Sequence, residues 1–364
     1  MKRICIFCEK WESGGIESFL TNVLTHMDLS EIQIDIVVSE LAKSVFVDPL
    51  KKLGITFFEL SGTQRRFLKN RELFQKHLQK KRYDIIYLNI FQGLSLQYLK
   101  IAQKYHIEYR IVHSHNTNLR KSWTRKLKLL IHRAAKLWYG KYATEYLACS
   151  KEAAEFMFPA QCRYRFIPNG IDVKRFSFCG EHREMMRKRL GAADTCLVIG
   201  SVGRLCTQKN QLFVLEIMAS LLYQNSNAIL LLIGDGEDRQ KLERRAETLG
   251  IKEHVVFYGT TQEVEPLYAA MDLLVFPSLF EGLGIVAIEA QVNGLPVLCS
   301  EYVPPEACIT NLAVTLPLTL GPVGWAEAVC RYAGHKTLSR DEIQCCQQFD
   351  INMVAEEMRH LFGA

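Results

Sequence analysis

The sequence predicts an α/β protein made of two doubly wound domains, each with a parallel sheet, facing each other across a central cleft. Its 364 residues exceed what one hydrophobic core normally supports. Short apolar runs of β type alternate along the chain with segments of helical periodicity. The stretch RFIPNGIDVKRF (165–176) brings Pro, Asn and Gly together between two such series, so the domain boundary is expected near residue 170.

The first series of expected strands predicts a domain spanning residues 1–168. It consists of RICIFC (3–8), QIDIVVS (33–39), DIIYLNI (84–90), YRIVHSH (109–115) and EYLACS (145–150). A helical pattern follows each run, as in a sheet whose parallel strands are covered by helices. Residues 349–364 contain an amphipathic pattern with Asp350 at the N-cap position, and we expect this terminal helix to pack back on the first domain.

The second series predicts a domain spanning residues 169–348. Its expected strands are CLVIGSVG (196–203), AILLLIG (228–234), HVVFYG (254–259), DLLVFPS (272–278) and PVLCS (296–300). Ligands bind open parallel sheets beyond the carboxyl ends of the strands. Three of these ends carry unusual residues, in GSVGRLCTQKNQ (200–211), LIGDGEDRQ (232–240) and PSLFEGLGIVAIEAQ (277–291).

Composition indicates a folded chain that remains in the cytoplasm. Apolar residues make up 48% and charged residues 23%, which is the ordinary globular range. The N-terminal apolar run is too short for an export signal, and no stretch is long enough to span a membrane. The 12 cysteines are therefore expected as reduced thiols. Cys5 and Cys8 would point to opposite faces of a strand, so no metal site is expected there.

Two cations after the first strand of the second domain suit a diphosphate. Gly203 allows a turn, Arg204 follows it, and Lys209 lies near the start of the next helix. Fixed positive charge beside a helix N-terminus favours an anion. The alternative is a pair of solvated surface charges.

Two carboxylates in an apolar stretch suit the hydroxyls of a sugar and a ribose. Glu281 lies in a loop, Gly282 and Gly284 allow the backbone to approach a ligand, and a helix beginning near Ile285 places Glu289 one turn in. The alternative is a loop acid and a glutamate stabilised by the helix dipole.

The first domain offers weaker candidates. Gly14 and Gly15 open a helix after the first strand, either for a ligand or for tight packing of strand and helix. His113 and His115 share a face at a strand end, where either a structural or a binding role is open.

VGRLCTQKN (202–210), GDGEDRQKLE (234–243) and the run from Val255 to Ser300 resemble glycosyltransferase family 4, and within it the capsular and exopolysaccharide branch. GGIESFL (14–20) and VHSHN (112–116) add weaker matches. The resemblance implies the GT-B fold of two Rossmann-like domains. It also implies a retaining transfer of a hexose from a nucleotide-sugar, expected to be a UDP-sugar, to a lipid-linked or polysaccharide acceptor.

The resemblance also implies roles for individual residues. His115, Arg204, Lys209 and Glu281 would form the catalytic set, with Glu281 on the donor sugar and the two cations on the diphosphate. The implied donor-binding positions are Gly14, Gly15, Gly203, Gly259, Thr260, Gly282, Leu283, Gly284, Ile285 and Glu289, the last on the ribose. The family is thought to react on one face of the sugar, with the leaving phosphate taking the acceptor's proton. No DxD motif occurs, so neither a metal nor another cofactor is expected.

The basic stretch 119–141 predicts contact with an anionic surface. It holds eight Lys or Arg and no acid, interleaved with apolar residues that include Trp123 and Trp138. One alternative is peripheral binding to the inner face of the membrane, and the other is a helix that packs its apolar stripe into its own domain. No nucleic-acid partner is expected.

Two rival functions remain at this stage. A nucleotide-sugar epimerase of the same fold would turn over donor without acceptor. A non-catalytic nucleotide-sugar-binding protein would bind donor without transfer.

Overall fold

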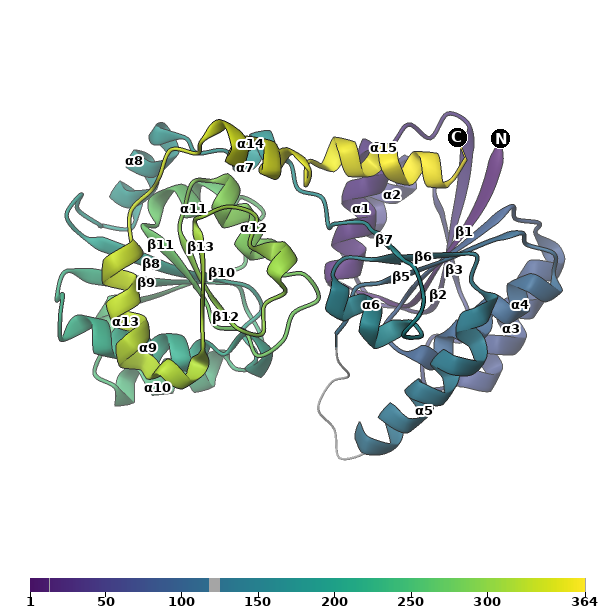
Figure 1. Cartoon of the computed structure of the whole chain (residues 1–364), viewed down its shortest axis with the longest axis horizontal. Coiled ribbons are helices and arrows are strands. Elements are labelled where there is room, and N and C mark those ends of the chain that lie inside the picture. Colours follow the sequence, from purple (N-terminus) through teal and green to yellow (C-terminus); the bar gives the residue numbers. More distant parts are fainter. Residues whose placement is uncertain (13, 118–124, 364) are drawn as a thin grey trace. The chain divides into compact units, whose positions relative to one another are not determined.

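The computed structural model describes residues 1–12, 14–117 and 125–363 (Figure 1). The chain divides into two compact units, one formed by residues 1–170 together with 349–364 and the other by residues 171–348. The sequence placed the corresponding boundary between residues 168 and 169. No helix among the described ranges has the length and apolar character needed to cross a membrane.

The first unit contains a parallel sheet with the strand order β3-β2-β1-β4-β5-β6-β7. Its strands are β1 (Lys2–Trp11), β2 (Ile32–Leu41), β3 (Thr56–Glu59), β4 (Ile85–Ile90), β5 (Tyr109–Ser114), β6 (Glu145–Ala148) and β7 (Arg165–Phe166). Its helices are α1 (Gly15–His26), α2 (Val47–Lys52), α3 (Phe67–Lys80), α4 (Gln97–Lys104), α5 (Arg125–Tyr139), α6 (Lys151–Met157) and α15 (Ile351–Leu361). The sequence did not predict β3 and β7, because these edge strands have only four and two residues and show little periodicity.

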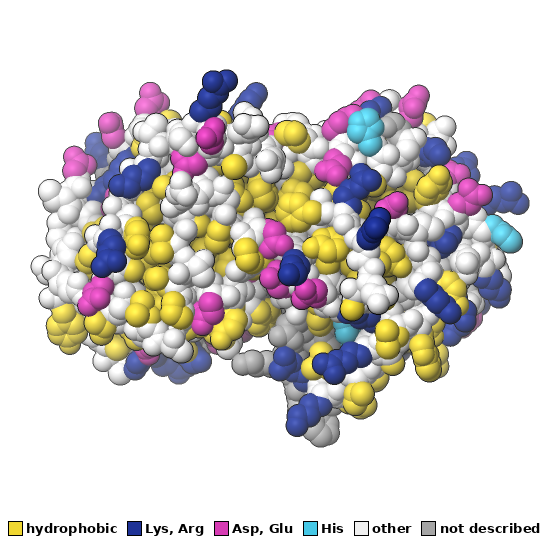
Figure 2. All heavy atoms as spheres, viewed as in Figure 1, with side chains coloured by type: hydrophobic (Ala, Val, Ile, Leu, Met, Phe, Trp, Pro, Cys, Tyr) yellow, Lys and Arg dark blue, Asp and Glu magenta, His cyan; other side chains and the backbone are white. Residues whose placement is uncertain are grey.

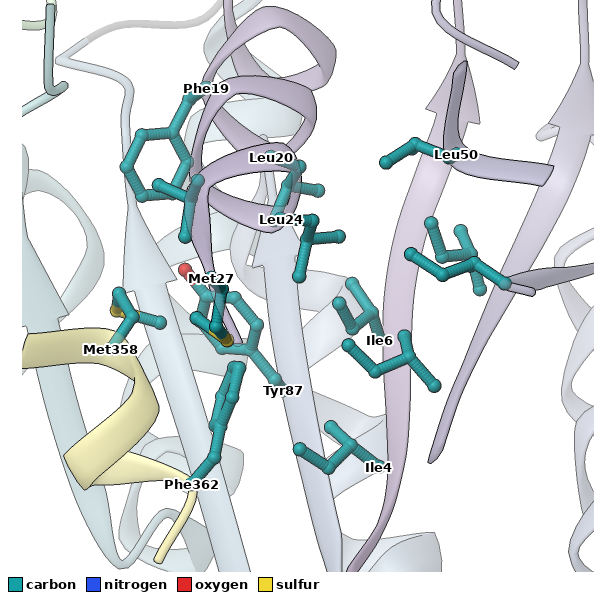
Figure 3. Packing of buried hydrophobic residues seen from close by; sticks show 14 of the residues in the cluster. Ile4, Ile6, Phe19, Leu20, Leu24, Met27, Leu50, Tyr87, Met358 and Phe362 are labelled. Atoms are coloured by element: carbon teal, nitrogen blue, oxygen red, sulfur yellow. The ribbon is translucent and has the colours of Figure 1, made fainter. Parts of the chain in front are cut away.

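Apolar side chains from β1, β2, β4 and α1 form the core of the first unit (Figure 3). The C-terminal segment completes this core. Asp350 caps α15 by accepting a hydrogen bond from the Asn352 amide at 2.9 Å. Met358 and Phe362 are buried in the same cluster, and the rings of Tyr87 and Phe362 lie 5.6 Å apart. A segment at the end of the sequence thus packs against elements from its beginning.

The second unit contains a parallel sheet with the strand order β10-β9-β8-β11-β12-β13. Its strands are β8 (Leu197–Val202), β9 (Ala228–Ile233), β10 (Val255–Gly259), β11 (Leu273–Phe276), β12 (Val297–Ser300) and β13 (Ala313–Leu316). Its helices are α7 (Val173–Phe176), α8 (Gly180–Arg189), α9 (Gln211–Leu222), α10 (Arg239–Thr248), α11 (Glu265–Ala270), α12 (Ile285–Val292), α13 (Gly321–Tyr332) and α14 (Arg340–Gln347). The two-domain α/β prediction is confirmed, although the short edge strand β13 was missed.

The strand order reverses once in the middle of each sheet. The reversal lies between β1 and β4 in the first unit and between β8 and β11 in the second. Loops that leave neighbouring strands at such a point diverge and open a crevice at the carboxyl ends, which is where ligands bind in doubly wound sheets. Lys209 follows β8 and Glu281 follows β11, while Glu9 and Asn89 lie toward the carboxyl ends of β1 and β4.

Candidate functional site

Lys209 and Glu281 form an ion pair in the second unit. Lys209 Nζ donates to Glu281 Oε1 at 2.7 Å, and the two side chains are only 16% and 8% exposed. The ammonium also lies 4.8 Å from the centre of the Phe276 ring. Because little water reaches the pair, its charges are weakly screened. The structure therefore brings together two of the residues expected to be catalytic.

Three further hydrogen bonds join the loop after β8 to the loop after β11. The Leu279 amide donates to the Gln208 carbonyl at 2.8 Å, and Gln208 Nε2 donates to the Phe280 carbonyl at 2.9 Å. Asn210 Nδ2 donates to the Pro277 carbonyl at 3.2 Å. These bonds fix the two loops that carry the ion pair, so its geometry is set before a ligand arrives.

Two glycines with positive φ shape these loops. Gly203 has φ +139°, and a Cβ at this position would lie 3.2 Å from Lys209 Cε. Gly284 has φ +91° and precedes α12, where a Cβ would lie 3.1 Å from the Phe276 ring. L side chains rarely adopt such backbone conformations. Since α12 begins at Ile285, as the sequence predicted, the amides at its start are available to an anion, except that of Ala287, which donates to the Gly284 carbonyl at 2.9 Å.

Glu289 lies one turn into α12 beside a buried tyrosine. Tyr268 donates its hydroxyl to Glu289 Oε2 at 2.7 Å. Burial raises the pKa of Glu289 to about 7, and the Tyr268 hydrogen bond and the charges of Arg175 and Lys209 only partly oppose this effect. Because Lys209 acts electrostatically on Glu289 and is paired with Glu281, one cation lies within reach of both carboxylates.

Arg204 is separate from this pair. Its side chain is 59% exposed and lies 3.3 Å from Glu237, an exposed acid of the loop after β9. Exposed pairs of this kind contribute about 0–1 kcal/mol, so Arg204 can exchange Glu237 for a ligand at little cost. Nearby, the Gly234 amide donates to the Gly259 carbonyl at 2.8 Å, which holds the ends of β9 and β10 together. Thr260 follows at an exposed position.

The remaining positions of the loop before α12 differ in exposure. Leu283 is 2% exposed and belongs to the buried apolar residues of the unit. Gly282 is half-buried and lies between Glu281 and Leu283. Leu283 therefore anchors the loop, while Gly282 lies nearer the surface.

The two glycines that open α1 have different surroundings. A Cβ on Gly14 would lie 2.7 Å from Glu17 Oε2, whereas a Cβ on Gly15 would meet nothing within 4 Å. A side chain at position 14 would therefore displace the Glu17 carboxylate, whereas the space beside Gly15 is open. Burial raises the pKa of Glu17 to about 7. The Glu12 amide donates to Glu17 Oε1 at 3.3 Å, while Oε2 has no hydrogen-bond partner among the described residues.

His113 and His115 lie side by side at the end of β5, with ring centres 3.9 Å apart. His113 Nδ1 is hydrogen-bonded to the Tyr87 hydroxyl at 2.6 Å within the core. His115 Nε2 lies 3.0 Å from Asn89 Oδ1. An amide oxygen only accepts, so this contact places the proton of His115 on Nε2. Burial lowers the pKa of His115 to about 3, and the imidazole is therefore neutral near neutral pH.

Three polar residues near these positions were not predicted as site residues. Asn89 is fully buried, Glu17 is 1% exposed and Glu9 is 5% exposed. The Phe91 amide and Gln92 Nε2 donate to the Glu9 carboxylate at 3.3 and 3.4 Å. Burial raises the pKa of Glu9 to about 7. The available signal was a polar residue inside a run of strand type, such as Asn89 in DIIYLNI.

Two family patterns match the chain, one in each unit. The family described as "Glycosyltransferase Family 4" matches residues 13–175. The family described as "Glycosyl transferases group 1" matches residues 182–315, the part that holds Lys209, Glu281 and Glu289.

Curated relatives cover most of the chain. The "Putative glycosyltransferase EpsF" of Bacillus subtilis (strain 168) is 27% identical over 359 residues, covering 94% of this chain and 91% of that protein. An Escherichia coli enzyme named "UDP-Gal:alpha-D-GlcNAc-diphosphoundecaprenol alpha-1,3-galactosyltransferase" is 27% identical over 232 residues, which are 62% of this chain and 59% of that enzyme.

Solved structures share the fold. Anabaena HepE in complex with UDP has a TM-score of 0.80 at 20% identity, with 99% of both chains covered. WaaG, a glycosyltransferase involved in lipopolysaccharide biosynthesis, has a TM-score of 0.72 at 18% identity, with 98% of both chains covered. The predicted GT-B fold is confirmed by these likenesses.

Proposed function

The chain belongs to glycosyltransferase family 4 and is a glycosyltransferase, and we propose that it moves a hexose from a UDP-sugar with retention of anomeric configuration and without a metal ion. The observation that carries the proposal is the Lys209–Glu281 ion pair, which joins the loops on either side of the strand-order reversal in the second unit. HepE has been solved with UDP and with UDP-glucose, which supports the choice of uridine.

In this proposal the second unit binds the donor. Lys209 and Arg204 bind the diphosphate together with the first-turn amides of α12. Glu281 accepts hydrogen bonds from hydroxyls of the hexose, and Glu289 accepts them from the ribose. Gly259 and Thr260 border the base. A diphosphate that approaches Lys209 supplies an anion to the ammonium and leaves Glu281 available for the sugar.

The transfer breaks the bond between the anomeric carbon and the diphosphate oxygen and forms a bond to the acceptor hydroxyl on the same face. The acceptor proton passes to the departing phosphate oxygen. Negative charge grows on the diphosphate as the bond breaks, and Lys209 stabilises it where water is largely excluded. A fixed cation here takes the place that a metal ion has in other transferases. We assign His115, whose imidazole is neutral near neutral pH, to the donor sugar, as the family resemblance implies.

We assign the acceptor to lipid-linked or polymeric glycans of capsule or exopolysaccharide synthesis. Support comes from the name of one relative, the galactosyltransferase whose acceptor is a diphosphoundecaprenol. A lipid-linked acceptor would bring the enzyme to a membrane surface.

Helix α5 has the composition and the side-chain exposure that are typical of a helix lying on a membrane surface. Its inner face is held by His132, which accepts from the Gly93 amide at 2.8 Å and contacts the Phe156 carbonyl at 2.9 Å. Its apolar side chains face outward, with exposures of 60% for Leu127, 66% for Leu130, 43% for Ile131, 66% for Leu137 and 71% for Trp138. Figure 2 shows yellow and dark-blue side chains side by side around the lower part of the first unit, where Figure 1 places α5.

This exposure supports one of the two alternatives for the basic stretch, which is peripheral contact with a membrane. The apolar stripe of the described part does not pack into its own domain, and Trp123 lies outside the described residues. Lys126, Lys128 and Arg133 are exposed on the same helix. An apolar outward face flanked by cations matches an anionic bilayer, in which the apolar side chains insert and the cations contact headgroups. We propose peripheral binding to such a surface.

The transfer is tested with the purified chain, a panel of UDP-sugars and lipid-linked acceptors. We expect a glycosylated acceptor, an unchanged anomeric configuration by NMR, and equal rates with and without a chelator. Turnover of donor alone would identify an epimerase, and binding without transfer across the panel would identify a non-catalytic protein.

The membrane surface is tested by vesicle sedimentation. The double substitution Leu130→Gln with Trp138→Gln is expected to weaken binding to phosphatidylglycerol vesicles at least about tenfold, with weaker binding at higher salt. Leu68→Gln on α3 is the matched control, because Leu68 is 77% exposed outside the stripe. Equal losses in the two variants would contradict the assignment.

A further inference from the structure

Two cysteines of the second unit lie close together beside strand β12. Cys299 belongs to β12 and is fully buried, whereas Cys308 is half-buried in the segment that joins β12 to β13. Thr315 of β13 is the register partner of Cys299, and Cys308 Sγ lies 3.9 Å from Thr315 Oγ1. Register partners on neighbouring strands point to the same face of a sheet. The Cys308 sulfur therefore lies on the face to which Cys299 points.

A buried amide fixes the backbone on both sides of Cys308. Gln291 of α12 is fully buried, and its Oε1 accepts from the amides of Ile309 and Thr310 at 2.9 Å each. Its Nε2 donates to the Ala307 carbonyl at 2.7 Å. Because the residues before and after Cys308 are both held by this side chain, the Cys308 thiol is kept in place beside Cys299.

The two thiols hold their protons with different strength. Hydrogen bonding with Cys299 lowers the pKa of Cys308 to about 7, although burial opposes this effect. The same hydrogen bond, burial and the charge of Glu281 raise the pKa of Cys299 well above its usual range. About half of Cys308 is therefore thiolate at pH 7, while Cys299 keeps its proton. Because thiolate is the nucleophilic form and Cys308 is not fully buried, the pair combines an accessible nucleophile with a neighbouring thiol.

We propose that Cys308 and Cys299 are a site of oxidation by hydrogen peroxide, at which a disulfide forms. The Cys308 thiolate attacks one peroxide oxygen, the O–O bond breaks, and the departing hydroxide takes up the proton that Cys308 had released. Cys308 is then a sulfenic acid. The Cys299 sulfur attacks the Cys308 sulfur, the S–O bond breaks, and the oxygen leaves as water with the thiol proton. Two thiols are oxidised to one disulfide, and one peroxide is reduced to two waters.

The oxidised segment borders the start of α12. A Cβ on Gly284, the residue before α12, would lie 3.4 Å from Val303 Cγ1 and 3.7 Å from Ala307 Cβ. An S–S bond brings its two sulfurs closer than any non-bonded contact, so Cys308 moves toward β12 and the segment before it shifts. We expect weaker binding of UDP in the oxidised chain. This effect rests on the proposed function, which assigns the amides at the start of α12 to the diphosphate, whereas the disulfide itself does not.

The test treats the reduced full-length chain with hydrogen peroxide, blocks the remaining thiols and maps disulfides by mass spectrometry. A cross-link between Cys299 and Cys308 is expected, and dithiothreitol should remove it. Alkylation of Cys308 by iodoacetamide should have its midpoint near pH 7. Cys299→Ala should raise that midpoint by about one pH unit, because the hydrogen bond to the thiolate is lost. Peroxide treatment that leaves both thiols free, or links either to another cysteine, would overturn the proposal.

UDP binding measured by calorimetry tests the connection to the donor site. Peroxide should reduce the UDP affinity of wild type at least about fivefold, and Cys308→Ser should abolish this loss. Cys330→Ser is the matched control, since Cys330 is an exposed cysteine of the same unit outside the segment, and it should behave as wild type. A cross-link with unchanged UDP affinity would contradict the effect on the donor site. A reduced chain that forms the cross-link but binds no UDP would contradict the proposed function alone.

Discussion

Both units join their central loops through a carboxylate at the point of strand-order reversal, but the partner of that carboxylate differs. In the second unit Glu281 pairs with the Lys209 ammonium at 2.7 Å. In the first unit Glu9 accepts from the Phe91 amide and from Gln92 Nε2 at 3.3 and 3.4 Å. One connection is an ion pair, and the other rests on neutral donors.

The difference extends to the groups nearby. In the first unit burial holds Glu9 and Glu17 at pKa values of about 7 and His115 at about 3, so these groups are mostly neutral or readily become so. In the second unit Glu289, whose pKa is also about 7, has the neutral Tyr268 as its partner. In the proposed transfer, the fixed charge of Lys209 lies where the diphosphate departs, and Glu289 with its neutral partner lies where the ribose hydroxyls bind.

The largest expected effect follows from removing the cation. Lys209→Ala should lower kcat/KM about 10²- to 10³-fold, because a positioned charge that stabilises a leaving group in a dry site has that magnitude. It should also lower the free energy of unfolding by about 3 kcal/mol, because the Glu281 carboxylate, 8% exposed, loses its ammonium partner. Steady-state kinetics and urea unfolding measure the two effects.

Glu281→Gln is the companion substitution and should lower kcat/KM at least about tenfold. The double variant Lys209→Met with Glu281→Gln should regain most of the lost stability without regaining activity. Near-wild-type rates in both single variants would contradict the assignment of Lys209 and Glu281 to the donor site.

The corresponding carboxylate of the first unit should act on stability in a pH-dependent manner. The pKa of Glu9 is raised from 4.5 to about 7, so its stabilising contribution is complete below pH 4.5 and is lost as the pH rises through 7. Each tenfold change in proton affinity corresponds to about 1.4 kcal/mol, which gives a loss of about 3 kcal/mol for this buried group. Glu9→Gln should therefore unfold at higher urea concentration than wild type at pH 8 but not at pH 4.5.

Glu59→Gln is the control for this profile, because Glu59 is an exposed acid of the same unit. Its urea midpoint should follow the wild-type pH dependence. If the urea midpoint of Glu9→Gln also depended on pH as that of wild type does, Glu9 would not be the group that titrates. The proposed difference between the ion-paired carboxylate of the second unit and the neutral carboxyl group of the first would then be contradicted.

The sequence was most informative about the site residues that carry a charge. Glu281 and Glu289 interrupt an apolar stretch and Lys209 follows an expected strand, so their position could be predicted. Asn89 could not, because the sequence does not show whether a polar residue in a buried segment has a hydrogen-bond partner. The periodicity of α5 predicted an apolar stripe, but its direction depends on the tertiary contact of His132 with Gly93.

The smallest expected effect concerns Asn89, which fixes the proton of His115 through a 3.0 Å contact with Nε2. Asn89→Asp would place a carboxylate there and raise the pKa of His115 from its value of about 3. The variant should then lose about threefold in kcat/KM between about pH 8 and pH 6 as the imidazole becomes charged, whereas wild-type His115 does not titrate in that range. Asn89→Ala, which removes the acceptor without adding charge, should lower the rate equally at all these pH values. If kcat/KM of Asn89→Asp and of wild type depended on pH in the same way, the charge at position 89 would have no effect on His115. The role assigned to the protonation state of His115 would then be contradicted.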